Sequence, residues 1–313
     1  MAGTVAARPA RQLGDDLGYR RRVLADIAVT EDLVRALLRD QHPDLAALPL
    51  RIVASGWDNV VLRLGDDLAV RVPRREVAAH LVDHEQRWLP VLGDLVRGTV
   101  PVPTPVRIGV PTPEYPWHWS VVPWFDGQPA IGTDAERPQV VDALAAFVIA
   151  LHVPAPPDAP HNPVRGGPLA GRADVVAERL ASGAVPHADG VSAVWARALA
   201  APPYAGPPVW LHGDLHPHNL VVSDGRLAAV VDFGDVTAGD PATDFATAWL
   251  TTNGREARGR FRASVTADDA TWMRARGWAV TMATAVVVAT RPGDGLHVMG
   301  LRAIDALLDD PSA

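Results

Sequence analysis

Residues 212–219 read His-Gly-Asp-Leu-His-Pro-His-Asn, and residues 232–235 read Asp-Phe-Gly-Asp. Short apolar runs over 209–211, 220–222 and 227–231 flank the two motifs, which predicts polar loops at strand ends. Asp214 stands five positions before Asn219 and eighteen before Asp232. Phosphoryl transfer needs a carboxylate that orients and deprotonates the attacking hydroxyl, and oxygen ligands that hold magnesium against the phosphates. These three residues can supply both.

The same segment resembles the aminoglycoside phosphotransferase family, in which a His-Gly-Asp-Leu-His-Pro-x-Asn loop replaces the His-Arg-Asp loop of protein kinases. The resemblance implies Asp214 as the catalytic base, Asn219 and Asp232 as ligands of Mg²⁺, and ATP or GTP as phosphoryl donor. It runs in family order from about residue 51 to residue 250. It therefore implies an α+β, two-lobed protein-kinase-like fold, with a small antiparallel-sheet N-lobe and a larger helical C-lobe.

Residues 239–246, Gly-Asp-Pro-Ala-Thr-Asp-Phe-Ala, also resemble the family's stretch downstream of the second magnesium ligand. We expect Asp240 and Asp244 to brace the catalytic loop, by capping the helix that begins near Thr243 and by bonding loop amides. Direct contact with substrate is the alternative.

On the nucleotide side, the family has a basic residue on the third strand, paired with a glutamate of the following helix. Arg71 and Glu85 match these positions, with Glu76 as a weaker alternative partner. All 29 basic residues are arginines, so an arginine here replaces the lysine that is commoner in kinases, and Val-Arg-Val-Pro-Arg-Arg over 70–75 resembles macrolide phosphotransferases. Arginine binds phosphate bidentately and keeps its charge.

Two further segments are candidates for nucleotide contact. Backbone amides near Ser55 and Gly56 lie where a hairpin would cover the phosphates, although ordinary turn formation explains the same residues. Residues 119–127 resemble the family's linker between lobes, where backbone groups bond the purine base. Pro123 has no N–H to donate, so we expect Trp124 to be the donor.

Periodicity predicts helices over 30–39, 76–92, 140–152, 173–180, 191–199 and 272–288, and strands over 51–54, 59–64, 68–72, 106–108 and 119–122. We expect a flexible arm over 1–20, the nucleotide-binding N-lobe over 21–125, and the C-lobe with the catalytic loop and acceptor-binding helices over 126–313. The Pro- and Ala-rich residues 153–168 should form a surface loop.

Composition excludes several classes of chemistry. Without cysteine there is no disulfide or thiolate site, and without lysine there is no Walker-type phosphate loop and no Schiff base. The net charge of −7 disfavours nucleic acid as a partner. No apolar stretch is long enough to span a membrane, so we expect a soluble, cytoplasmic protein. The oligomeric state stays open.

The sequence says least about the acceptor, the molecule that receives the phosphoryl group. The family resemblance suggests an antibiotic of aminoglycoside or macrolide type, bound by residues 174–199 and the C-terminal helices. A macrolide needs a wide apolar pocket, which these residues could help to line if they are not core: Trp272, Met273, Trp278, Val280 and Met282. Alternatives are a metabolic kinase of an amino alcohol or sugar, a protein kinase, a non-catalytic nucleotide-binding module, and a zinc cluster of His212, His216 and His218.

Overall fold

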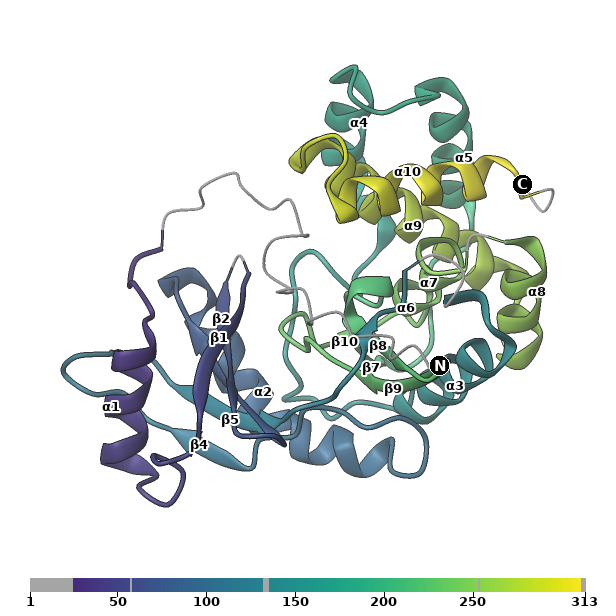
Figure 1. The fold of residues 1–313 in the computed structure, drawn as a ribbon. Coiled ribbons are helices and arrows are strands. Elements are labelled where there is room, and N and C mark those ends of the chain that lie inside the picture. The colour runs from purple at the N-terminus through teal and green to yellow at the C-terminus, as the bar shows by residue number, and fades with distance from the viewer. Residues whose placement is uncertain (1–24, 57, 132–134, 253, 311–313) are drawn as a thin grey trace, which may run out of the picture.

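The computed structural model describes residues 25–56, 58–131, 135–252 and 254–310 (Figure 1). The arm predicted over 1–20 lies outside this range. The N-terminal part holds a five-stranded antiparallel sheet in the order β1-β2-β3-β5-β4. Its strands are β1 (Leu50–Ser55), β2 (Asn59–Leu64), β3 (Leu68–Pro73), β4 (Arg107–Gly109) and β5 (Trp119–Pro123).

Helix α1 (Glu31–Gln41) covers this sheet. It begins where the Thr30 side chain accepts a hydrogen bond from the backbone N–H of Leu33, at 3.1 Å, which satisfies a donor that the helix leaves unpaired. Its buried residues join those of β2 and β3 in one hydrophobic cluster with Tyr115 and Trp119. On β2, buried residues alternate with partly exposed ones, as expected of a strand with one face on a core.

Helix α2 (Glu76–Leu95) lies between β3 and β4 in the chain and contacts both this sheet and the helical part. Its residues Trp88, Leu89 and Leu92 belong to the second and larger hydrophobic cluster. The helix therefore fixes the position of the sheet against the C-terminal part, and it carries the buried Glu85 between the two.

The C-terminal part is mainly helical (Figure 1). Its helices are α3 (Pro138–Leu151), α4 (Ala173–Ala181), α5 (Ala188–Ala200), α6 (Ala242–Phe245), α7 (Thr247–Leu250), α8 (Arg255–Ser264), α9 (Asp269–Ala289) and α10 (Gly295–Leu308), with 3-10 turns at Leu169–Arg172 and Pro217–Asn219. Two small sheets pair β10 (Thr237–Gly239) with β7 (Val209–Leu211), and β6 (Gln128–Pro129) with β8 (Leu220–Ser223) and β9 (Arg226–Val230).

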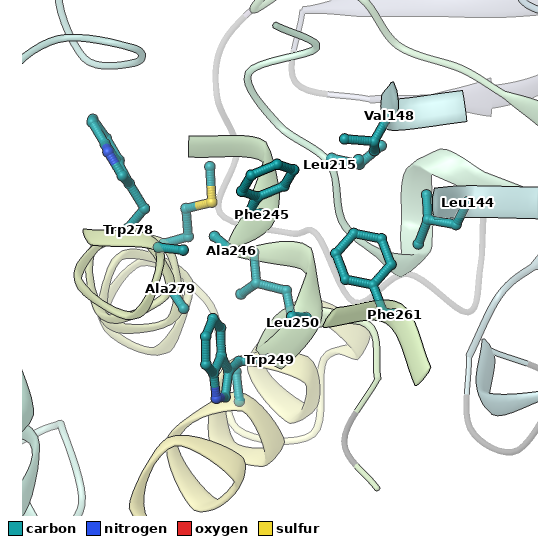
Figure 2. Close-up of a cluster of buried hydrophobic side chains, with 14 of the residues drawn as sticks. Leu144, Val148, Leu215, Phe245, Ala246, Trp249, Leu250, Phe261, Trp278 and Ala279 are labelled. Atoms are coloured by element: carbon teal, nitrogen blue, oxygen red, sulfur yellow. The ribbon is translucent and has the colours of Figure 1, made fainter. Parts of the chain in front are cut away.

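Figure 2 shows part of the larger core, where Phe245, Trp249 and Phe261 meet Leu144 and Val148. Leu215 points into the same cluster, so the residue that follows Asp214 anchors the catalytic loop in the core. Helix α9 is buried on most of its circumference, including Arg274 and Arg276, which bond Asp240 and the carbonyl oxygen of Leu307. Trp272, Trp278, Val280 and Met282 belong to this core, whereas Met273 is only partly buried.

The predicted sheet and helical remainder are confirmed. The predicted helices are present and extend by a few residues, while α8 and α10 were not predicted individually. Within the described residues, no helix combines the length and apolarity needed to cross a bilayer.

Candidate active site

The loop after β7 is held in place by a buried carboxylate. Asp244 accepts hydrogen bonds from the backbone N–H groups of His212 and Gly213, at 2.8 and 2.9 Å, and contacts the His152 ring at 3.1 Å. Gly213 has φ +85°, and a Cβ there would lie 2.3 Å from the carbonyl oxygen of Asp235, so only glycine fits. Asp244 therefore braces the loop, while Asp240 bonds Arg274 at 2.6 Å and the N–H of Ala242 at 3.0 Å.

Asp214 lies at the centre of this loop with 27% of its side chain exposed. Arg165 Nη2 is 3.2 Å from one carboxylate oxygen, Oδ1, and His216 Nε2 is 3.2 Å from the other, Oδ2. Burial acts to raise the pKa of Asp214, but the His216 and Arg165 charges outweigh it and hold that pKa below its usual value. The carboxylate is thus ionised and available to accept a proton.

His216 and His212 have separate structural tasks. His216 faces Asp214 with Nε2, while its Nδ1 lies 3.3 Å from the backbone nitrogen of His218. Burial acts to lower the pKa of His216, and the neighbouring Asp214 reverses this and raises it. His212 Nε2 lies 3.0 Å from the carbonyl oxygen of Val231, and its Nδ1 accepts from the N–H of Asp214 at 3.2 Å. The contact between His212 and Val231 ties the loop at 212–219 to the loop at 232–235.

Asn219 and Asp232 present oxygen atoms near this base. The Asn219 amide nitrogen donates to the carbonyl oxygen of Asp214 at 2.9 Å, which leaves its side-chain oxygen for other ligands. Asp232 has φ +65°, a conformation that non-glycine residues rarely adopt, and its side chain is 56% exposed. One carboxylate and one amide oxygen form the donor set that Mg²⁺ prefers, so these residues fit the ion that the sequence predicted.

Arg71 joins Asp232 to Glu85. Its guanidinium lies 3.0 Å from Glu85 and 3.3 Å from Asp232, and both Arg71 and Glu85 are buried. Burial raises the pKa of Glu85 to about 7, partly offset by the Arg71 charge. The predicted pairing of Arg71 with Glu85 is therefore present, whereas Glu76 is an exposed residue in the first turn of α2.

The hairpin between β1 and β2 is fastened rather than open. The N–H of Gly56 closes the turn onto the carbonyl oxygen of Asn59 at 2.9 Å, and Ser55 Oγ accepts from Arg74 at 2.7 Å. The amide of Gly56 is thus used by the turn, which corrects the expectation that it is free to cover phosphates. Contact of Ser55 with a nucleotide would require the Arg74 bond to open.

Trp124 also differs from expectation. Its N–H donates to the carbonyl oxygen of Asp67 at 2.8 Å, and its indole Nε1 donates to Asp126 at 2.7 Å. Arg63 stacks over the ring, 4.7 Å from the ring centroid. Because the backbone donor is already used, Trp124 is not the free donor for a purine base that the sequence suggested.

Arg165 is the site residue that sequence reasoning missed. It lies in the predicted surface loop 153–168, and besides contacting Asp214 it donates from Nε to the carbonyl oxygen of Gly213 at 2.7 Å. Forty-nine positions separate Arg165 from Asp214, and no motif marks it. Only the tertiary fold reveals this contact.

The zinc alternative finds no support among the described residues, where no group of three or more His, Asp or Glu side chains is arranged to hold a metal ion. His212, His216 and His218 have different partners. Burial lowers the pKa of His218 to about 4, and its side chain bonds the backbone of Gly295. The three rings therefore do not share a ligand position.

Comparison with known proteins identifies the family and the fold. The profile of the phosphotransferase enzyme family matches residues 49–278. The GDP complex of aminoglycoside 2'-phosphotransferase-IIIa is 18% identical, with a TM-score of 0.65 over 89% of this chain and 99% of that one. Macrolide 2'-phosphotransferase from Brachybacterium faecium is 21% identical, with a TM-score of 0.55 over 90% and 98%. No curated protein sequence matches. The predicted two-lobed, protein-kinase-like fold is thereby confirmed.

Proposed function

This chain belongs to the phosphotransferase enzyme family and is a kinase-type enzyme that acts on a small molecule, and we propose that it moves the terminal phosphoryl group of ATP or GTP onto an acceptor hydroxyl with Asp214 as the base. The observation that carries the proposal is the pinned loop that presents an ionised, partly exposed Asp214 beside Asn219 and Asp232.

In the proposed reaction, the acceptor oxygen attacks the terminal phosphorus while its proton passes to Asp214. The bond from that phosphorus to the bridging oxygen breaks, and a nucleoside diphosphate leaves. Because its pKa is low, Asp214 is a weak base that mainly orients the hydroxyl and takes the proton late, as a loose transition state allows. Arg165 and His216 hold the carboxylate in place.

On the donor side, Arg71 is placed to contact the phosphates, and Glu85 fixes its guanidinium. Mg²⁺ bound by Asn219 and Asp232 would neutralise phosphate charge as the bond breaks. We propose that the cleft between the N-terminal sheet and the helical part is where donor and acceptor meet, because Arg71, Glu85 and Asp232 come together there from both parts.

An antibiotic of aminoglycoside or macrolide type is the acceptor class that the family suggests, since solved relatives include complexes with kanamycin and gentamicin. One observation favours the alternative of a sugar-like metabolite. The side chain that contacts Asp214 from the loop 153–168 is a cation, Arg165, which suits a polycationic acceptor poorly.

The test is phosphoryl transfer by purified protein with Mg²⁺, ATP or GTP, and a panel of aminoglycosides, macrolides, sugars and amino alcohols. We expect nucleoside diphosphate release that depends on one acceptor class, with that acceptor gaining one phosphoryl group by mass spectrometry, and loss of both signals when a chelator removes the metal. Nucleotide binding without transfer to any acceptor would favour the non-catalytic module. Failure to bind nucleotide would contradict the proposal.

A further inference from the structure

One segment of the chain carries three arginines, and the first of them contacts the base. Arg165 contacts Asp214, Arg172 ends the 3-10 turn before α4, and Arg179 lies in the last turn of α4. They stand seven positions apart. Arg172 directly precedes α4, and Arg179 lies about two helical turns further along the chain.

Arg165 lies on one defined side of the base. Asp214 Oδ2 faces His216, whose pKa also responds to Asp232, and Asp232 contacts Arg71. The other oxygen, Oδ1, faces Arg165. Phosphates held by Arg71, with Mg²⁺ at Asp232, would therefore approach one oxygen of the base, which leaves the Arg165 side for the acceptor.

The positive charge on this side is only partly compensated. Arg165 is balanced by Asp214 and Asp235, whose carboxylates both stabilise its charged form. Arg172 has no ion-pair partner among the residues that the structure describes, and its buried Nε has no hydrogen-bond partner. Burial lowers the pKa of Arg172, and the nearby Arg165 lowers it further. Arg172 is therefore a cation near Arg165 that has a buried donor and no opposite charge bound to it among the described residues.

Arg179 extends this charge. Its Nη1 donates to the carbonyl oxygen of Thr281 on α9 at 2.9 Å, which holds the side chain against that helix. Burial lowers the pKa of Arg179, and Arg172 and Arg165 add to the effect, while Glu178 opposes it. Leu169, in the turn that carries Arg172, is buried in the main core, so the backbone beneath the arginines is anchored.

We propose that the acceptor carries an anionic group, a carboxylate or a phosphate, which Arg172 and Arg179 bind while its hydroxyl meets Asp214. Guanidinium groups match both anions in bidentate geometry. The inference rests on the proposed function and narrows its acceptor class to hydroxylated acids such as sugar acids or sugar phosphates. A polycationic aminoglycoside would meet like charge at this position.

The experiment compares four hexose probes that differ in charge: glucose, glucosamine, glucuronate and glucose 6-phosphate, with malonate as a small dianion. Their binding is measured from the shift in the thermal unfolding midpoint over a concentration series, at constant ionic strength because salt screens such contacts. Saturating Mg-ADP is present throughout, so that its own site is occupied. The variants are Arg172→Gln, Arg172→Lys, and the matched control Arg39→Gln on the exposed face of α1, far from α4 (Figure 1).

We expect saturable stabilisation by at least one anionic probe and none by glucose or glucosamine. Arg172→Gln should weaken that binding about tenfold, the loss expected of one charge-assisted hydrogen bond. Arg172→Lys should keep part of it, and Arg39→Gln all of it. Preference for glucuronate over glucose 6-phosphate, or the reverse, separates the two kinds of anion.

The proposal is overturned if no anionic probe stabilises the protein more than glucose does, or if Arg172→Gln and Arg39→Gln behave alike. The midpoint shift caused by Mg-ADP alone is recorded separately, on the same protein preparations with and without Mg-ADP and before any probe is added. A normal nucleotide shift with no anion effect refutes the anionic acceptor and leaves phosphoryl transfer standing. An anion effect without any nucleotide shift supports the anion site and contradicts phosphoryl transfer from a nucleotide.

Discussion

At the residue scale, Asp214 shares its two carboxylate oxygens between two cations, Arg165 and His216. The two neighbouring positive charges keep the carboxylate ionised and fix its orientation. For a weak base, this orientation matters more than a high proton affinity. Arg71 does the equivalent on the donor side, where it bridges Glu85 and Asp232. Asp214 is thus positioned by a cation from its own loop and by one from another segment, and Arg71 by carboxylates from two other segments.

The Asp214–His216 pair predicts a pH dependence of stability. Asp214 has a lowered pKa, so its contribution is present above its ordinary value of 3.8 and is lost as pH falls through the folded value. His216 has a raised pKa, so its contribution is full below its ordinary value of 6.5 and is lost as pH rises through the folded value. The pair therefore stabilises the fold most between these two ordinary values.

We expect His216→Gln to lower the free energy of unfolding by about 1–3 kcal/mol at pH 5 to 6, the range for a hydrogen bond to a charged group, and by less as pH rises above neutrality. Urea unfolding of both proteins across this range measures the difference. A difference that stays constant with pH would contradict the ion pair.

At the element scale, the loop after β7 depends on the short helix α6, because Asp244 on α6 accepts the N–H groups of His212 and Gly213. Leu215 anchors the same loop in the core formed with α3, α7 and α9 (Figure 2). Elements of only a few residues can position the base because they are buried on several sides.

Asp244→Asn should therefore destabilise the protein by about 2–3 kcal/mol, since an amide has one accepting oxygen where the carboxylate uses both. Chemical denaturation gives the value. The matched control is Asp268→Asn, at the N-cap of α9, where Asn caps as well as Asp and we expect a change under about 0.5 kcal/mol. Equal losses in the two variants would refute the bracing role of Asp244.

The sequence predicts those parts of the candidate site that lie in short local motifs. The spacing of Asp214, Asn219 and Asp232, and the strand and helix that carry Arg71 and Glu85, were readable because each lies in a short patterned segment. Gly56 and Trp124 are candidate N–H donors in the sequence, but the hydrogen bonds to Asn59 and Asp67 that use these groups are set by the folded turns. Arg165 was unreadable because its partner lies in a different segment.

Helix α10 shows the same limit for the fold. Its sequence contains Gly295 and Gly300, which weaken the helical pattern. The structure explains one of them, because a Cβ on Gly300 would lie 2.7 Å from the side chains of Val286 and Val287 on α9. The glycine permits close helix packing, a reason that appears only once the two helices are side by side.

At the scale of the whole molecule, two hydrophobic clusters form, one under the N-terminal sheet and one within the helical part. Helix α2 contributes to the second while it carries Glu85 toward the sheet residue Arg71. The proposed donor contacts thus come from both parts, and the base comes from the helical part. Arginines and carboxylates hold the reacting groups in place, and the chain contains no lysine or cysteine.

The most direct test of the central claim is a comparison of the wild type with Asp214→Asn, using the acceptor identified in the panel and measuring both kcat and the Kd of Mg-nucleotide. We predict that kcat falls about a hundredfold to ten-thousandfold, the usual worth of a general base, while the nucleotide Kd stays within about twofold. Asp66→Asn, in the exposed turn after β2, should change neither value. Turnover of Asp214→Asn equal to that of the wild type would contradict Asp214 as the base and the account built on it.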